Sequence, residues 1–282
     1  MKIIRTVKEM QEASDAFRKE GKRIGFVPTM GYLHEGHLAL VREAKRLADV
    51  VVASIFVNPI QFGPKEDLAR YPRDLGRDSA LLEQERTDVL YFPDAAGMYP
   101  PGYSTYVEVR ELEDHLCGLS RKGHFTGVAT VVAKLFNAVK PHFAVFGQKD
   151  YQQLKVIQRM VRDLDMDLEI IGYPTVREEG GLAMSSRNAY LSPGERELAL
   201  LIQASMKKVE ELFRGGERKA RVLEAEARRV LTSKGGIDIE YVTVCDAETF
   251  HGLEEVGTSA LLAIAAKVGK TRLIDNTVLM ER

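Results

Sequence analysis

The stretch from Ile24 to Ala44, IGFVPTMGYLHEGHLALVREA, constrains the fold of this chain more than any other. It opens with the apolar residues of an expected strand, which ends at Pro28-Thr29. A turn with two glycines follows, and from His37 onward the apolar residues fall at helical spacing with charges on the opposite face. The stretch therefore predicts a buried strand, a glycine-containing turn and an amphipathic helix.

Two histidines, His34 and His37, fall on this turn and on the first residues of the helix. The start of a helix presents unpaired backbone N–H groups and the positive end of the helix dipole, so phosphate groups bind there. Imidazoles add hydrogen-bond donors, and glycine lets the backbone approach a ligand closely. The alternative is a pair of polar loop residues, but HxGH between a strand and a helix favours an anion site.

A zinc site is a further interpretation of these histidines. A helical metalloprotease site needs H-E-x-x-H, with its histidines four residues apart. Here the second histidine comes three residues after the first, and we expect Glu35 to face solvent. The spacing does not fit such a site.

Composition narrows the class of protein. The 282 residues suffice for one large or two modest domains, and 45% apolar with 29% charged residues is typical of a soluble globular protein. The 40 Lys and Arg residues nearly balance the 41 Asp and Glu residues, for a net charge of −1. This balance gives no sign of a nucleic-acid or membrane-surface partner.

Cysteine usage and apolar runs bear on the compartment. Cys117 and Cys245 are far apart, with no disulfide framework or metal-ligand spacing. No apolar signal-peptide core follows Met1, and the longest apolar run, 259–268, is too short to span a bilayer. We expect a cytoplasmic protein.

Strand and helix patterns alternate through the first part of the chain. Alternation of this kind predicts an α/β fold with a Rossmann-like, doubly wound parallel sheet. After the opening strand and helix within 3–23, further strands are expected at 50–57, 88–92, 105–109, 143–146 and 168–171, and helices at 68–85, from after Gly127 to Val139, and at 151–164.

The character of the chain changes near 174–177. Two helices, 193–213 and 217–234, precede three strands at 237–244, 260–268 and 271–279, which predicts a smaller C-terminal α+β domain. Ser192 and Glu195 have the spacing of a capping box at the first of these helices. The expected domains are therefore 1–175 and 176–282.

Polar residues follow two of the expected parallel strands, where ligands of open α/β sheets bind. Gln61 lies in the loop after 50–57, and it either binds a small polar substrate or faces water. Lys149 follows 143–146, and Gln153 lies one turn into the next helix. These side chains could face one crevice.

Two more glycine-bearing segments are candidate anion sites. The basic turn 121–127 precedes a helix, and it is either a second anion site or a solvated charge cluster. The segment 176–190 contains two glycines, two serines and Arg187 without periodicity, which suggests a phosphate-contacting loop.

HxGH after a first strand is the signature of the nucleotidyltransferase-type Rossmann superfamily, which includes class I aminoacyl-tRNA synthetases. The longer wording PTMGYLHEGHLALV closely resembles the pantothenate synthetase (pantoate–β-alanine ligase) family. The agreement covers most of residues 1–190 and continues, in order, with SIFVNPIQF, YPRD (71–74), GHFTGV (123–128), FGQKDYQQL (146–154) and AMSSRN (183–188).

The resemblance implies an ATP-dependent condensation of (R)-pantoate with β-alanine through pantoyl adenylate, giving AMP and pyrophosphate. It implies Mg²⁺ with the ATP, with no protein ligand that we can name, and a homodimer. Domain 1–175 would bind ATP and pantoate, and domain 176–282 would close over the ATP site.

The resemblance also assigns residues. His37 would be the proton donor, with His34, Lys149 and Arg187 as further catalytic residues. Pantoate would contact Gln61 and Gln153, β-alanine would arrive near Gln61, and Asn58, Arg121 and His124 would belong to the same pocket. The ATP ligands would be Met30, His34, His37, Gly147, Lys149, Asp150, Val176, Met184, Ser185, Ser186 and Arg187.

Three alternatives compete with this hypothesis. A class I aminoacyl-tRNA synthetase needs a KMSKS-like loop, whereas AMSSRN has one Arg and no Lys. An adenylyltransferase acting on a phosphate acceptor keeps HxGH but lacks the setting of Gln61 and Gln153. A nucleotide-binding regulator without turnover would not need the four residues His34, His37, Lys149 and Arg187 together.

Overall fold

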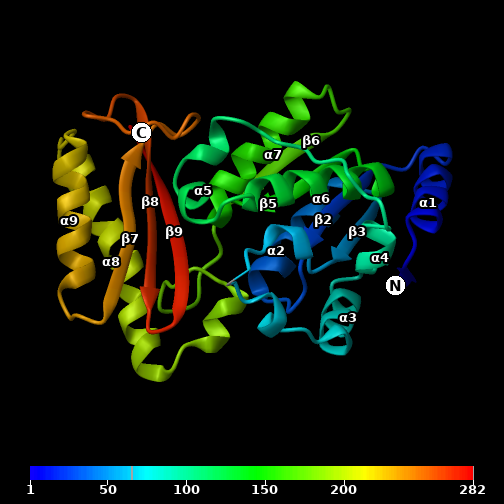
Figure 1. Ribbon diagram of the computed structural model, residues 1–282, viewed down its shortest axis with the longest axis horizontal. Helices are drawn as coiled ribbons and strands as arrows, with labels where there is room; N and C mark the ends of the chain where they lie inside the picture. The colour runs from blue at the N-terminus through cyan, green and yellow to red at the C-terminus, as the bar shows by residue number, and fades with distance from the viewer. Residues whose placement is uncertain (65, 282) are drawn as a thin grey trace. The chain divides into compact units, whose positions relative to one another are not determined.

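The computed structural model describes residues 1–64 and 66–281, which form two compact units (Figure 1). The first unit comprises Met1–Glu113, Ser120–Gln148 and Gln152–Pro174. The second unit comprises Asp114–Leu119, Lys149–Tyr151 and the residues from Thr175 onward. Two short segments that precede Thr175 in the sequence thus belong to the second unit.

The first unit is built on a six-stranded sheet in which every neighbouring pair is parallel. From β2 the chain winds through β3 and β4 to one side, and β5 and β6 lie on the other, so the order reverses between β2 and β5. The predicted Rossmann-like, doubly wound sheet is confirmed. Its order is β1 (Lys2–Ile4), β4 (Val89–Tyr91), β3 (Val50–Ile55), β2 (Ile24–Thr29), β5 (Phe143–Gly147) and β6 (Glu169–Tyr173).

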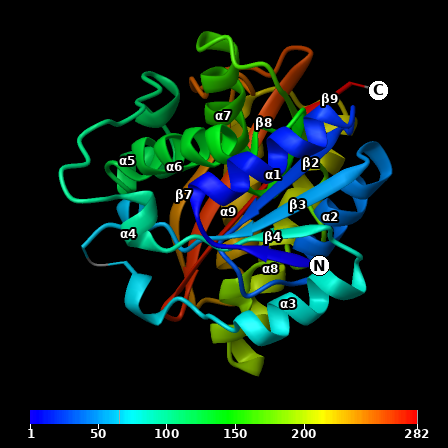
Figure 2. The same cartoon turned by 90° about the vertical axis from the view of Figure 1, so that its right-hand side faces the viewer.

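Alternate side chains of the central strands face opposite layers, as the period of two along a strand requires. On one face, Val27 and Val51 pack in a buried cluster with Val41 of α2 (Glu35–Leu47). On the other face, Phe26 meets Phe136 of α6 (His124–Val139) edge to face, with ring centroids 6.3 Å apart. Helices therefore cover both faces of the sheet (Figure 2).

Some expected elements have different bounds. The helix expected over 68–85 begins only at Leu75, because Pro72 interrupts the pattern and Asp74 accepts the Arg77 N–H as the N-cap. Residues 105–109 form no strand in the described chain, and the Val107 N–H donates to Thr130 Oγ1 at 2.9 Å instead. Helix α6 begins at His124, before Gly127 rather than after it.

Further helices lie between the strands before Thr175. In the first unit they are α1 (Val7–Lys19), α3 (Leu75–Gln84), α4 (Ala95–Met98) and α7 (Tyr151–Asp163), with short 3₁₀ helices η1 (Pro59–Gln61), η2 (Leu68–Arg70) and η3 (Leu112–Asp114). Helix α5 (Cys117–Ser120) and the 3₁₀ helix η4 (Gln148–Asp150) fall mostly in the segments that belong to the second unit.

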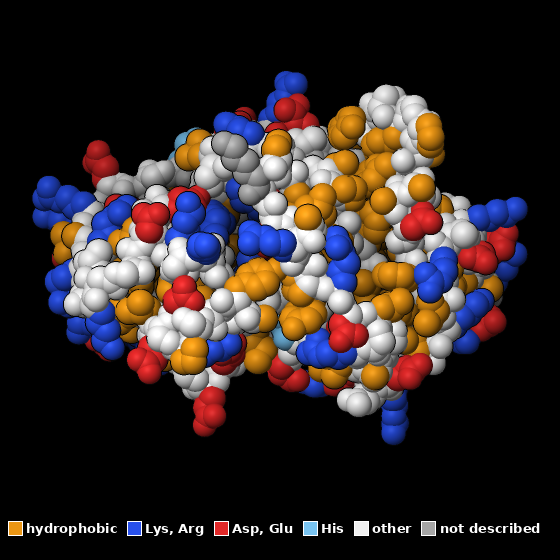
Figure 3. All heavy atoms as spheres, turned by 60° about the horizontal axis from the view of Figure 1, so that its bottom comes forward, with side chains coloured by type: hydrophobic (Ala, Val, Ile, Leu, Met, Phe, Trp, Pro, Cys, Tyr) orange, Lys and Arg blue, Asp and Glu red, His pale blue; other side chains and the backbone are white. Residues whose placement is uncertain are grey.

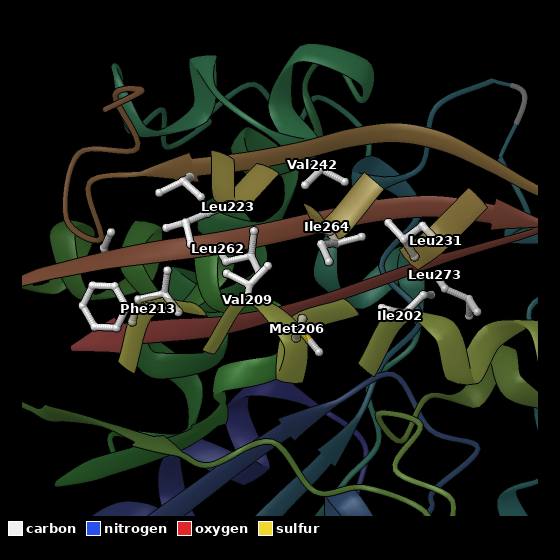
Figure 4. Close-up of a cluster of buried hydrophobic side chains, with 14 of the residues drawn as sticks. Ile202, Met206, Val209, Phe213, Leu223, Leu231, Val242, Leu262, Ile264 and Leu273 are labelled. Atoms are coloured by element: carbon white, nitrogen blue, oxygen red, sulfur yellow. The ribbon is translucent and has the colours of Figure 1, made fainter. Parts of the chain in front are cut away.

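The second unit pairs three antiparallel strands with two helices, which confirms the smaller α+β unit. The strands are β7 (Ile237–Cys245), β8 (Ser259–Val268) and β9 (Thr271–Met280), and the helices are α8 (Pro193–Arg214) and α9 (Ala220–Thr232). Met206 and Phe213 of α8 lie in the core that Leu262 and Ile264 of β8 complete (Figure 4). The capping box expected at Ser192 is present at the start of α8.

Charged side chains of both signs are interspersed over the face of the molecule shown in Figure 3. Among the described residues, none of the helices combines the length and the apolar character that crossing a bilayer requires.

Candidate active site

The HxGH turn starts directly at the end of β2. Thr29 Oγ1 donates to the Ser54 carbonyl at 2.7 Å and accepts the Gly31 N–H at 3.1 Å. Gly31 has φ +83°, and a Cβ there would lie 2.9 Å from Ile55 Cγ2 on the neighbouring strand. Glycine is therefore required for both the conformation and the close approach.

His34 is the N-cap residue of α2, and His37 lies in the first turn of that helix. The two rings stack, with centroids 4.0 Å apart and planes inclined by 28°. The His34 N–H donates to Nδ1 of His37 at 3.3 Å. Because that nitrogen accepts, the ring proton of a neutral His37 is on Nε2. The predicted pairing of two imidazoles with a helix start is confirmed as geometry.

Asp78 of α3 holds the backbone of the HxGH turn by hydrogen bonds, a role that the sequence did not predict. Its carboxylate accepts the N–H groups of Tyr32 at 2.6 Å and Leu33 at 2.8 Å, and it is only 1% exposed. Arg77 donates to the Leu33 carbonyl at 2.8 Å. Burial raises the pKa of Asp78, and the two N–H donors oppose that rise. An aspartate soon after YPRD was the only sequence signal.

The sequence predicts that Glu35 faces solvent, but in the structure it is paired with an arginine. Its carboxylate pairs with the Arg42 guanidinium, which also holds Glu85 at 2.6 Å. The hydrogen bond from Arg42 outweighs the effect of burial and lowers the pKa of Glu35. Glu35 thus belongs to a surface ion-pair network on α2.

Asn58 and Gln61 lie side by side at the carboxyl end of β3, next to β2. Asn58 Nδ2 donates to Gln61 Oε1 and to the Gly127 carbonyl, both at 3.0 Å. Gln61 Nε2 points to Met30 Sδ at 3.2 Å. The structure therefore brings three of the predicted ligands, Met30, Asn58 and Gln61, into contact.

In the basic turn 121–127, which is expected to be either an anion site or a solvated charge cluster, Arg121 is mostly buried and bonded within the protein. Arg121 makes a two-pronged ion pair with Glu66, with both N–O distances 2.7 Å, and it also contacts His124 Nε2 at 2.9 Å. Since Arg121 only donates, His124 Nδ1 carries the ring proton and donates to the Gln61 carbonyl at 2.9 Å. Arg121 and His124 therefore support the backbone of Gln61.

The third polar strand end lies across the sheet reversal, at β5. Gly147 ends this strand, and a Cβ there would meet open space. Gln153 is half-buried in α7, whereas the adjacent Gln152 is buried and donates to the Leu112 carbonyl at 2.8 Å. In the part of the chain that the structure describes, no hydrogen bond engages the Gln153 side chain.

The remaining predicted ATP ligands belong to the second unit. Lys149 Nζ lies 3.6 Å from Asp150 Oδ1. The Met184 N–H donates to the Val176 carbonyl at 3.0 Å, which joins the two ends of the stretch 176–184. Ser185 then caps η5 (Ser186–Tyr190) by accepting the Arg187 N–H at 3.3 Å.

The described residues hold no group of three His, Cys, Asp or Glu side chains arranged to bind a metal ion.

A family model described as pantoate-beta-alanine ligase matches residues 2–278. The chain belongs to this family.

Relatives of the pantoate–β-alanine ligase family match over essentially their whole length. A pantothenate synthetase of Thermotoga petrophila is 57% identical over 99% of this chain and 100% of its own, and one of Geobacter sulfurreducens is 54% identical over 100% and 99%. The crystal structure of pantothenate synthetase from Thermus thermophilus has a TM-score of 0.94 at 44% identity and covers both chains fully.

A further solved structure carries ligands. The pantoate-beta-alanine ligase from Francisella tularensis, complexed with beta-gamma ATP and beta-alanine, has a TM-score of 0.79 at 34% identity, over 99% of this chain and 97% of its own. The fold and the order of motifs in this chain are therefore those of a family of ligases.

Proposed function

We propose that this chain condenses (R)-pantoate with β-alanine at the expense of ATP, through a pantoyl-adenylate intermediate, releasing AMP and pyrophosphate. The observation that carries the proposal is the pairing, at adjacent strand ends, of a two-histidine helix start with an amide donor on Gln61. The first suits phosphate groups, and the second suits the oxygens of a small acid. The family match over residues 2–278 supports the same reaction.

A carboxylate needs activation before an amine can attack it. In the first step, an oxygen of the pantoate carboxylate attacks the α-phosphorus of ATP, and the bond to the pyrophosphate oxygen breaks. This step brings an anion to a polyanion, so fixed donors and cations around the phosphorus lower its barrier. We assign that role to His34 and His37, with Lys149, Ser185, Ser186 and Arg187 as further ligands.

The remaining assignments concern the rest of the nucleotide. Met30, Gly147, Asp150, Val176 and Met184 are the other proposed ATP ligands. Their assignment rests on the match of their motifs to the family wording PTMG, FGQKD and AMSSRN.

In the second step, the neutral amine of β-alanine attacks the acyl carbon of pantoyl adenylate. The acyl C–O bond breaks, AMP leaves, and the nitrogen loses a proton to give the amide. No protein nucleophile is required, because holding the two reactants together supplies about 7–11 kcal/mol. Gln61 and Gln153 are proposed to hold pantoate, and Gln61 also lies where β-alanine would arrive.

The family resemblance supports three accompanying proposals. Mg²⁺ enters with the ATP substrate, on its phosphate oxygens, and no protein ligand is assigned to it. The chain functions as a homodimer, and it functions in the cytoplasm.

ATP–pyrophosphate exchange tests the first step. The exchange is measured with and without pantoate, omitting the amine, and we expect it to depend on pantoate. Exchange with a different carboxylic acid alone would keep the mechanism and change the substrate. If no acid supports exchange, AMP formation after adding β-alanine is measured, and its absence would overturn the ligase assignment.

A further inference from the structure

A chain of hydrogen bonds runs from the main chain of α6 to the proposed acid subsite. The Gly127 carbonyl accepts from Asn58 Nδ2 at 3.0 Å, and the same nitrogen donates to Gln61 Oε1 at 3.0 Å. The hydroxyl of Tyr99, at the end of α4, donates to Asn58 Oδ1 at 2.7 Å. Asn58 is 1% exposed, so these are its partners rather than water.

The donor and the acceptor of every hydrogen bond in this series follow from the Gly127 carbonyl, where the series begins. A carbonyl oxygen can only accept, so the NH₂ of Asn58 must face Gly127, and its oxygen must face Tyr99. The other N–H of Asn58 then meets the side chain of Gln61, which must offer its oxygen. The Gln61 NH₂ group consequently points away from Asn58.

The outward NH₂ of Gln61 meets only a weak partner. Met30 Sδ lies 3.2 Å from it, and a thioether sulfur is a poor acceptor. The part of the chain that the structure describes offers this nitrogen no second acceptor. A substrate oxygen that replaced the sulfur would therefore gain a better hydrogen bond.

The surroundings of Tyr99 keep its hydroxyl in the donating form. Its ring packs against Phe56 and Tyr103, with centroids 6.2 and 5.0 Å away. Burial raises the pKa of Tyr99 far above its ordinary value, so the proton stays on the oxygen at physiological pH.

We infer that Tyr99 is a positioning residue for the acid substrate, because through Asn58 it holds the Gln61 amide with its NH₂ toward the subsite. The subsite then selects a molecule that offers an oxygen acceptor at this point and rejects one that offers an N–H donor. This inference rests on the proposed role of Gln61 in binding pantoate, and neither the motifs nor the family match assigned Tyr99 a role.

Tyr99→Phe removes one hydroxyl and tests the inference. We expect the pantoate KM to rise about three- to tenfold, as for loss of one hydrogen bond, while kcat and the ATP KM stay within about twofold. Tyr103→Phe is the matched control, because it removes a hydroxyl from the same aromatic cluster and, within the described chain, that hydroxyl makes no hydrogen bond. Its pantoate KM should not change.

Asn58→Asp provides a second test through polarity. The new carboxylate still accepts from Tyr99 but cannot donate, so the Gln61 amide turns over and presents its oxygen to the substrate. We expect a larger rise in the pantoate KM than Tyr99→Phe causes. Tyr99→Phe should then raise the pantoate KM less in the Asn58→Asp background than in the wild type, because both residues act through the same series of hydrogen bonds.

Three results would overturn the inference. An unchanged pantoate KM in Tyr99→Phe, with a raised one in Gln61→Ala, would remove Tyr99 and leave the proposed function intact. An unchanged KM in both variants would also remove Gln61 from pantoate binding. A lower kcat, a lower melting temperature and equal rises in every KM would show that Tyr99 only stabilises the fold.

Discussion

The backbone N–H of His34 donates to Nδ1 of His37 at 3.3 Å, and the two imidazole rings stack with their centroids 4.0 Å apart. This bond keeps a proton off Nδ1, so the neutral ring presents Nε2–H as its donor. The catalytic contribution proposed for His37 is therefore a donor at one defined atom.

His37→Ala should slow ATP–pyrophosphate exchange about 10²- to 10³-fold, the usual cost of losing one donor to a developing anionic charge. His37→Gln should retain more activity than His37→Ala, because its terminal NH₂ can approach the position of Nε2. Equal rates in the two variants would mean that the donor at Nε2 is unimportant. A near-normal rate in His37→Ala would remove the residue from the mechanism.

Asp78→Asn should disturb the histidine turn without touching a histidine. The amide places an NH₂ group against one of the N–H groups of Tyr32 and Leu33, so a buried donor loses its acceptor. We expect the free energy of unfolding to fall by about 1–3 kcal/mol and the exchange rate to fall by up to about 10²-fold.

Asp74→Ala is the matched control for Asp78→Asn. It removes the N-cap of the same helix, which costs about 1 kcal/mol of stability but leaves the turn bonded. Denaturant unfolding and exchange are measured on both. If Asp74→Ala slows exchange as much as Asp78→Asn does, general loss of stability explains both effects.

Asp275→Asn should destabilise the second unit. Arg177 donates to both oxygens of Asp275, at 2.6 and 3.1 Å, and the carboxylate is only 2% exposed. Removing one charge of a buried pair costs about 3 kcal/mol, near the lower bound here because Arg177 is partly exposed. Thermal unfolding would show the loss directly.

Arg187→Ala should lower activity without lowering stability, in contrast to Asp275→Asn. Pyrophosphate formation should slow, because a proposed phosphate ligand is removed, while the melting temperature stays close to that of the wild type. A melting temperature lowered as far as in Asp275→Asn would assign Arg187 a structural role.

His142 predicts a pH dependence of stability. Its Nδ1 accepts the Ile24 N–H at 2.9 Å, and burial, with the charges of Arg18 and Arg23, lowers its pKa below the ordinary 6.5. The folded protein therefore favours the neutral ring. The stability that this provides is present above about pH 6.5 and is lost as pH falls toward the lower, folded-state pKa.

The melting temperature of the wild type should thus fall between about pH 7.5 and about pH 5.5, in part because of His142. His142→Asn keeps an acceptor for the Ile24 N–H but cannot titrate, so its melting temperature should fall less. An identical fall in both proteins would show that other groups cause the pH dependence.

Periodic segments of this chain could be read from the sequence, and single-residue partnerships could not. The buried strand before HxGH and the helix after it alternate in patterns that local geometry dictates. The bound at Leu75 was also within reach, since Pro72 and Asp74 are a break and a cap. The strand expected at 105–109 failed because β-branched and aromatic residues there carry no information about a neighbouring strand.

The contacts that shape the candidate site join residues far apart in the chain. Asp78 meets Leu33 across 45 residues, Tyr99 meets Asn58 across 41, and Arg121 meets Glu66 across 55. None of these pairs lies on a periodic pattern that would indicate its partner. A sequence shows which polar residues follow the strands. Only the folded structure shows which polar residues position other site residues through hydrogen bonds.

Gly127 has no Cβ, and one added there would lie 2.7 Å from the Gln61 Cα and from the Ile60 carbonyl. Helix α6 can therefore contact η1 only with glycine at this position. The Gly127 carbonyl is also the one acceptor among the hydrogen bonds from α6 to Gln61 that no mutation can convert into a donor. The polarity of the acid subsite is thus inherited from the main chain. Redesign toward a substrate with an N–H group would therefore have to change the side chain that stands between this carbonyl and the subsite, as Asn58→Asp does, because the carbonyl itself remains an acceptor.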